Sequence, residues 1–239
     1  MKCVIFCGGK GSRMGELTRE TPKPLLMIGD KPAIMHIMDH YASYNIREFI
    51  LCLGHKAEMF KEYFRDNKTE YDIEFVDTGE DTNKAQRLLK IKNLVGDKFF
   101  LSYGDDISNV NIKELIQHHD TYNKVATLTA VRLPNPYGTL ETDDFNTHII
   151  TKFREKPLMK EWINGGYFVL SRQIFDFINE GDDFEENVLP KLANNREITA
   201  FKHLGFWKSM NTIKDHSELN DTHKSGKLKQ IFQIIEDGK

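Results

Sequence analysis

Two cationic side chains follow a glycine-rich turn near the start of the chain. Residues 7–26 read CGGKGSRMGELTRETPKPLL, with three glycines among the first five residues, then Arg13 and Lys23. Glycines allow successive backbone N–H groups to turn together towards one bound anion. The guanidinium of Arg13 could hydrogen-bond two phosphate oxygens, and Lys23, held between two prolines, offers a compact positive charge. This order of residues predicts a nucleoside triphosphate site.

Two common phosphate-binding motifs do not fit this turn. The P-loop requires G-x-x-x-x-G-K-[ST], and no glycine of the turn is followed by Lys-Ser or Lys-Thr. The dinucleotide motif G-x-G-x-x-G would begin at Gly9 and Gly11, but Met14 occupies its third position and Gly15 comes one residue late. The alternative is an ordinary strand-to-helix turn, which leaves Arg13 and the Pro-Lys-Pro segment unexplained.

A carboxylate follows a second apolar segment. Asp105 comes directly after Tyr103-Gly104, at the expected end of a buried strand. Opposite a phosphate-binding turn, such a carboxylate could hold Mg²⁺ on the triphosphate. The alternative is a helix cap or a turn aspartate. Together with the glycine turn, the position of Asp105 favours metal binding.

The strands and helices that must position these residues alternate in the first half of the chain. This alternation is typical of a doubly wound, mostly parallel α/β sheet, in which ligands bind beyond the carboxyl ends of the strands. The glycine turn, Thr78-Gly79 and Asp105 fall at such ends, so we expect them to lie together. The hydrophobic pattern predicts strands at 2–7, 48–53, 73–77 and 99–103, and helices at 32–44, 57–64 and 84–94.

The second half of the chain is richer in β-structure. We expect a hairpin there, with its turn at 143–146, and a last helix at 228–235 that either covers the core or pairs with another subunit. The remaining pattern predicts strands at 126–132, 138–141, 148–154 and 166–171, and helices at 174–179 and 185–192.

Length and composition place the chain among ordinary globular proteins. The length of 239 residues predicts a single domain, residues 1–239. Contents of 39% apolar and 29% charged residues are typical of a globular domain. The net charge of −3 disfavours a nucleic-acid partner. No apolar run is long enough to cross a bilayer, and residues 4–7 are too short for a signal peptide. We therefore expect a cytoplasmic protein without a membrane partner.

Cysteine and histidine side chains predict no metal site. The three cysteines are an odd number within apolar segments, which is typical of reduced core residues. His36 and His40 lie four residues apart on an expected helix, but no third ligand is evident, so we expect core or surface positions. The pair at 118–119 is expected to be solvated.

Taken in order, the motifs of the chain resemble those of the sugar-1-phosphate nucleotidyltransferases, and most of all the glucose-1-phosphate cytidylyltransferases. The similarity covers nearly the whole chain. It rests on the glycine turn with Pro-Lys-Pro, YGDD at 103–106, EKP at 155–157, NGG at 164–166 and FWKSMNT at 206–212. The resemblance implies a Rossmann-like nucleotidyltransferase fold with a small β-rich part. It also implies that CTP, Mg²⁺ and a small phosphorylated acceptor give a CDP-linked product and pyrophosphate, for surface polysaccharide biosynthesis.

The resemblance also assigns roles to residues. Residues 1–125 would mainly bind the nucleotide and residues 126–239 the acceptor, with Arg13, Lys23 and Asp105 as catalytic residues. Nucleotide binding is implied for Gly8, Gly9, Lys10, Gly11, Ser12, Arg13, Lys23, Thr78, Gly79, Arg87, Tyr103 and Asp105. Acceptor binding is implied for Glu155, Lys156, Asn164 and Gly165, and metal binding for Asp105 and Asn211. Read without the resemblance, Glu-Lys-Pro is an exposed turn and Gly-Gly a bend.

Three departures from the family pattern keep alternatives open. Asn211 replaces an aspartate that binds metal, so an inactive nucleotide-binding regulatory subunit is one alternative. Ala85 and Gln86 replace a glycine pair near the base, so the nucleotide could be UTP, dTTP or GTP with a hexose 1-phosphate. The segment 64–73 is shorter than in the glucose-specific enzymes, where it helps to form subunit contacts and the hexose site. This leaves open whether the chain forms a homo-oligomer and whether the acceptor is a sugar 1-phosphate or a non-sugar phosphate.

Overall fold

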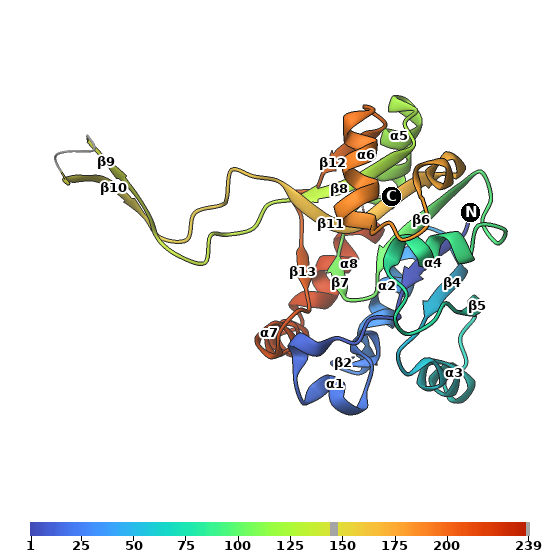
Figure 1. The fold of residues 1–239 in the computed structure, drawn as a ribbon. Coiled ribbons are helices and arrows are strands. Elements are labelled where there is room, and N and C mark those ends of the chain that lie inside the picture. The colour runs from blue at the N-terminus through green and yellow to red at the C-terminus, as the bar shows by residue number, and fades with distance from the viewer. Residues whose placement is uncertain (144–147, 238–239) are drawn as a thin grey trace.

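The computed structural model describes residues 1–143 and 148–237, and it is built on one seven-stranded sheet (Figure 1). The strand order across this sheet is β12-β8-β11-β6-β1-β4-β5. In chain order these strands are β1 (Cys3–Phe6), β4 (Glu48–Leu53), β5 (Asp72–Asp77), β6 (Lys98–Tyr103), β8 (Ala126–Val131), β11 (Ile163–Ser171) and β12 (Ile198–Lys202).

The sheet is mostly parallel, as the sequence predicts. Strand β1 pairs in parallel with β4 and β6, β4 with β5, and β8 with β12. Strand β11 is antiparallel to both of its neighbours, β6 and β8, and so is the one reversed strand among those of this sheet. The predicted doubly wound α/β fold is therefore confirmed, with a mixed second half.

Helices cover both faces of the sheet, which makes three layers. Cys3 and Ile5 of β1 face one apolar cluster, while Val4 and Phe6 face the other. A strand buried on both faces reads as a continuous apolar run, which is why β1 shows no alternation of polar and apolar residues. The α-helices are α1 (Leu17–Glu20), α2 (Ala33–Ala42), α3 (Ala57–Asp66), α4 (Lys84–Lys90), α5 (Ile112–Tyr122), α6 (Leu189–Asn194), α7 (Ile213–Lys224) and α8 (Lys227–Asp237).

Within residues 1–143 and 148–237, three short antiparallel strand pairs accompany the large sheet. Strand β7 (Asp106–Ser108) pairs with β13 (Trp207–Ser209), and β2 (Met27–Ile28) pairs with β3 (Lys31–Pro32). The predicted hairpin is formed by β9 (Thr139–Thr142) and β10 (Ile150–Arg154), and in Figure 1 it projects from the body as a long arm. The predicted turn at 143–146 falls, apart from its first residue, outside the described residues.

The last helix lies against the core, in agreement with one of the two predicted alternatives. Leu228 is fully buried, and the ring centroid of Phe232 lies 5.4 Å from that of His40 on α2. The three cysteines are buried and free, as expected. No described helix is both long and apolar enough to cross a membrane.

Two predicted helices are irregular in type, and one histidine was assigned wrongly. The segment predicted as a helix at 174–179 is a 3₁₀ helix, Arg172–Phe177, because its apolar residues fill a corner beside β11. The helix predicted at 185–192 begins as a π-helix, Phe184–Val188, and continues into α6. His119 is not solvated: it is buried and hydrogen-bonded to Thr127 and Ser171, since the last turn of α5 packs on the sheet.

Candidate active site

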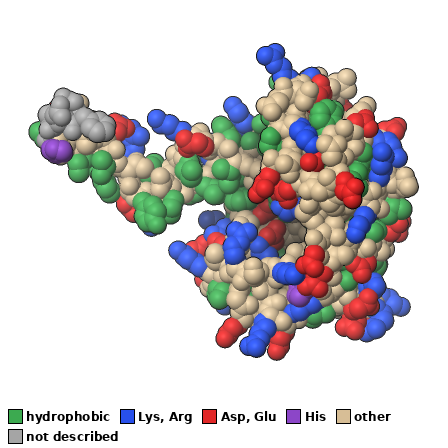
Figure 2. Space-filling view, viewed as in Figure 1, with side chains coloured by type: hydrophobic (Ala, Val, Ile, Leu, Met, Phe, Trp, Pro, Cys, Tyr) green, Lys and Arg blue, Asp and Glu red, His purple; other side chains and the backbone are tan. Residues whose placement is uncertain are grey.

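A cavity of about 780 Å³ opens at the carboxyl ends of β1 and β6. Figure 2 shows the body hollowed below the root of the arm. Of the residues that the sequence predicts for the site, the cavity is lined by Gly8, Gly9, Lys10, Gly11, Arg13, Lys23, Arg87, Tyr103, Asp105, Asn164 and Asn211. The structure thus brings together residues from both halves of the chain at one edge of the sheet.

Lys23 lies between the two predicted metal ligands. Its ammonium forms an ion pair with Asp105 and donates a hydrogen bond to Asn211 Oδ1 at 2.9 Å. The side chain of Lys23 is 12% exposed and that of Asp105 is 23% exposed, so the pair is shielded from most of the solvent. Lys23 begins a 3₁₀ turn, Lys23–Leu25, and the flanking Pro22 fixes the direction in which the chain enters it.

The donor set around Lys23 fits a divalent cation. The carboxylate of Asp105 and the amide oxygen of Asn211 are hard oxygen ligands that already hold one cation, the ammonium, between them. Among the described residues, no group of three or more His, Cys, Asp or Glu side chains could hold a metal by itself. Such a site suits Mg²⁺, which usually takes one or two protein oxygens and completes its shell with phosphate oxygens and water.

Arg87 packs against the glycine turn and braces it through hydrogen bonds. Its guanidinium is buried, which lowers its pKa, and it donates to the backbone oxygens of Leu53 and Gly8 at 2.8 and 3.1 Å. A Cβ atom on Gly8 would lie 2.1 Å from Arg87 Nη1, so only glycine fits above the guanidinium. Arg87 also donates to the Thr78 hydroxyl and to the Glu80 carbonyl. These hydrogen bonds of the guanidinium therefore hold the glycine turn in position.

Three residues predicted to contact the nucleotide do not line the cavity. Thr78 is buried and donates its hydroxyl to Leu53 O at 2.5 Å, so it supports Arg87. Gly79 adopts a φ of +90°, which turns the chain away from β5. Ser12 lies in a separate shallow pocket beside Lys10.

Tyr103 forms the side wall of the cavity within a polar cluster. Its hydroxyl donates to Glu185 at 2.6 Å and accepts from Asn164 Nδ2 at 3.2 Å. Burial and the neighbouring Glu185 raise the pKa of Tyr103. Lys84 lies 4.3 Å from the centre of the Tyr103 ring and pairs with Glu185. Sequence reasoning missed Lys84 and Glu185, since nothing in the local pattern links residues 101 positions apart.

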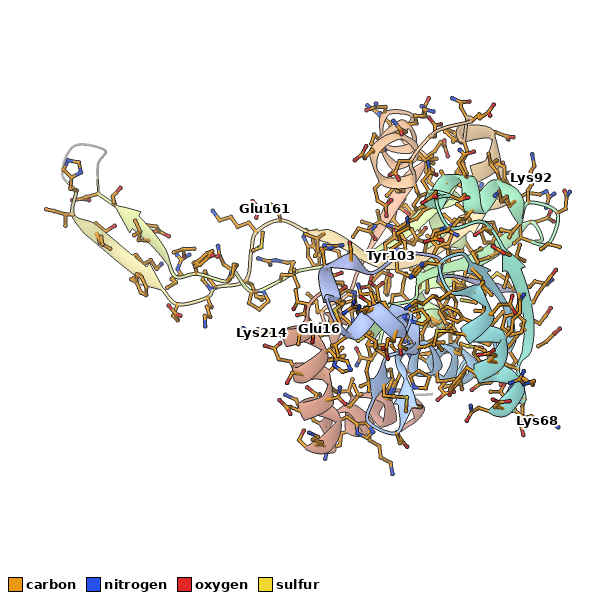
Figure 3. All side chains as sticks on the ribbon, turned by 60° about the horizontal axis from the view of Figure 1, so that its bottom comes forward. Glu16, Lys68, Lys92, Tyr103, Glu161 and Lys214 are labelled. Carbon is orange, nitrogen blue, oxygen red and sulfur yellow. The ribbon has the colours of Figure 1, made fainter. Side chains whose placement is uncertain are left out.

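The predicted acceptor residues fall in two places. Asn164 lines the cavity, and Gly165 lies beside it, with its carbonyl accepting a hydrogen bond from Trp207 Nε1 at 2.8 Å. Glu155 and Lys156 follow β10 on the arm, more than 60% exposed, and do not line the cavity. In Figure 3 the labelled Glu161 likewise lies on the arm, away from the labelled Tyr103 within the body.

Comparison with known proteins agrees with this geometry. Residues 2–225 match the family model described as nucleotidyl transferase. The chain belongs to this family. The resemblance drawn from the sequence is thereby confirmed, and the protein is a nucleotidyltransferase.

Individual relatives cover nearly the full length of this nucleotidyltransferase. The probable glucose-1-phosphate cytidylyltransferase of Bacillus subtilis is 39% identical over 258 residues, covering 98% of this chain and all of the relative. The glucose-1-phosphate cytidylyltransferase of Salmonella typhimurium is 36% identical, covering 95% and 97%. A crystal structure of HddC from Yersinia pseudotuberculosis, complexed with GMP-PN, has a TM-score of 0.72 at 22% identity, covering 93% of this chain and 99% of that one, and shows the shared fold.

Proposed function

We propose that this nucleotidyltransferase transfers CMP from CTP to a small phosphorylated acceptor, giving a CDP-linked product and pyrophosphate. The proposal rests on one observation. Lys23 contacts both Asp105 and Asn211 in the cavity that the glycine turn lines. The names of the relatives in Bacillus subtilis and Salmonella typhimurium support cytosine as the base.

In the proposed reaction, an oxygen of the acceptor phosphate attacks the α-phosphorus of CTP. The new P–O bond joins acceptor and CMP, while the bond from the α-phosphorus to the bridging oxygen breaks and its electron pair leaves with pyrophosphate. Lys23 neutralises charge that develops on the α-phosphate, and exposed Arg13 holds the departing phosphates. Mg²⁺ held by Asp105 and Asn211 would supply further positive charge to the phosphate oxygens.

For acceptor binding we propose Asn164 and Gly165 together with Glu155 and Lys156, the last two supplied by the arm of a second copy. These two residues do not line the cavity of their own chain. The arm bears apolar side chains that a homo-oligomer would cover: Tyr137, Leu140, Ile150 and Phe153 are 55–76% exposed. Lys156→Ala should then raise KM for the acceptor and leave KM for CTP unchanged.

The proposed function is tested by pyrophosphate release with Mg²⁺ and each of CTP, UTP, dTTP, ATP and GTP, using both hexose 1-phosphates and non-sugar phosphates as acceptors. Release that requires CTP and one acceptor supports the proposal and identifies the substrate. Release with UTP, dTTP or GTP and a hexose 1-phosphate would support the same fold with another base. Nucleotide binding without release by any pair would support an inactive regulatory subunit, for which Asn211 is the specific observation.

The proposed substrates and product also suggest where the reaction takes place and what consumes its product. CTP and pyrophosphate are cytoplasmic metabolites, so we place the protein in the cytoplasm. An activated CDP-linked product must be consumed by an enzyme that transfers or modifies its group. We propose surface polysaccharide or its decoration as the destination, and accumulation of unmodified polysaccharide in a deletion strain would support this.

A further inference from the structure

Asp106 is a buried carboxylate beside the proposed metal ligands that has no role in the reaction as described above. It is 4% exposed, lines the same cavity as Asp105, and begins β7. The charges of Lys23 and Lys84 act on its carboxylate from farther away, but among the described residues no lysine, arginine or histidine forms a direct ion pair with it. A buried carboxylate without a direct cationic partner costs stability, so its presence requires an explanation.

The backbone around Asp106 is fixed from two sides. Its carbonyl accepts a hydrogen bond from the hydroxyl of buried Tyr167 at 2.8 Å, and its register partner on β13 is Ser209. Gly166, with a φ of +75°, faces the carboxylate, and a Cβ atom there would lie 2.1 Å from Asp106 Oδ2. The fold therefore holds space open for this side chain.

A chain of polar contacts joins Asp106 to the centre of the site. Its carboxyl group interacts with the nearby Ser209 hydroxyl, which accepts a hydrogen bond from Asn211 Nδ2 at 2.8 Å. Asn211 in turn contacts Lys23, which pairs with Asp105. The two aspartates thus approach Lys23 from opposite ends of one network, while Asn211, between them, contributes no charge.

We propose that Asp106 supplies the second carboxylate oxygen to the divalent cation that Asp105 binds, while Asn211 contributes only a neutral amide. This inference rests on the proposed function, since it concerns the metal of that reaction. Two carboxylates and phosphate oxygens are a usual ligand set for Mg²⁺, and a divalent cation would compensate the adjacent charges of residues 105 and 106. The alternative is a purely structural acid that joins β7 to β13 through Ser209.

The test is Mn²⁺ binding in the presence of CTP, followed by electron paramagnetic resonance, which needs no turnover. Asp106→Asn keeps the shape of the side chain and should weaken Mn²⁺ binding by about 10- to 100-fold. Adding Asn211→Asp to this variant should restore most of that loss. The matched control is Asp120→Asn, a carboxylate on α5 that is 52% exposed, pairs with Lys98 and does not line the cavity, and it should change binding by less than about twofold.

The outcomes separate this inference from the proposed function. Loss of Mn²⁺ binding in Asp105→Asn, with unchanged binding in Asp106→Asn, overturns the role of Asp106 and leaves the proposed function standing. Absence of any CTP-dependent Mn²⁺ binding in the unaltered protein would overturn the metal centre itself. Asn211→Asp alone provides a check that does not depend on the folding of the Asp106 variant. It should change affinity by less than about threefold, and a gain above tenfold would show that Asp106 does not act as the second carboxylate.

Discussion

Replacing Arg87 by methionine tests whether this arginine braces the glycine turn. The substitution keeps the aliphatic stem and removes a guanidinium that donates to four oxygen atoms, on Gly8, Leu53, Thr78 and Glu80. Hydrogen bonds to charged groups contribute about 1.5–3 kcal/mol each, but two of the acceptors keep backbone donors: Leu53 O has Thr78 N and Gly8 O has His55 N. Some desolvation cost of the guanidinium is also recovered, so we expect a net loss of about 3 kcal/mol.

Thermal unfolding measures this loss. For a protein of this size about 3 kcal/mol lowers the melting temperature by about 10 °C. The matched control is Arg65→Met on α3, where the arginine is exposed and pairs only with its neighbour Asp66 among the described residues, and its melting temperature should stay within about 2 °C. KM for CTP should rise in the Arg87 variant and not in the control. A fall in melting temperature of less than about 3 °C for Arg87→Met would contradict the conclusion that Arg87 braces the glycine turn.

Three further predictions follow from the same geometry. Lys23→Met should lower kcat about 100- to 1,000-fold, because a charge at the reacting phosphate is lost; steady-state pyrophosphate release measures this, and near-normal turnover would contradict it. Burial lowers the pKa of His36 to about 4, so the unfolded state binds the extra proton between pH 6.5 and about 4, and stability should fall as pH drops through this range by up to about 3 kcal/mol. Urea unfolding of His36→Gln should show a smaller acid-side loss than the unaltered protein, with the remainder due to the other buried and half-buried histidines, and an unchanged pH profile would refute the assignment. Gly166→Ala should lower the urea midpoint by the equivalent of about 2 kcal/mol or more, because of its positive φ and the approach of Asp106 Oδ2, and an unaltered midpoint would show that the site relaxes freely.

Most of the fold could be predicted because its strands and helices carry strong local patterns. The apolar run Cys3–Phe6 predicts a buried strand, and the regularly spaced apolar residues of α2 predict a helix. The alternation of such strands and helices along the chain predicts a parallel sheet. The reversed direction of β11 was not predicted, since its sequence is as apolar as that of the parallel strands in the same sheet. The irregular helices at Arg172–Phe177 and Phe184–Val188 depend on how their apolar residues pack, which periodicity does not encode.

The sequence predicted part of the site, and there is a physical reason why the remaining residues could not be predicted. The glycine turn, Lys23 and Asp105 lie on short segments whose residue types carry the chemistry, and the structure brings them together. Arg87 could not be recognised as a brace from the sequence, because its partners come from four separate positions along the chain. The polar cluster of Lys84, Tyr103 and Glu185 depends on tertiary contacts alone.

The measurement that tests cytidylyl transfer most directly is ³¹P NMR of a reaction containing CTP, Mg²⁺ and the acceptor selected by pyrophosphate release, with the acceptor phosphate labelled with ¹⁸O. Attack of the acceptor phosphate on the α-phosphorus predicts two coupled diphosphate resonances, ¹⁸O in the new bridge of the product, and pyrophosphate free of label. Label in pyrophosphate, or consumption of CTP without a diphosphate-linked product, would contradict the proposed reaction.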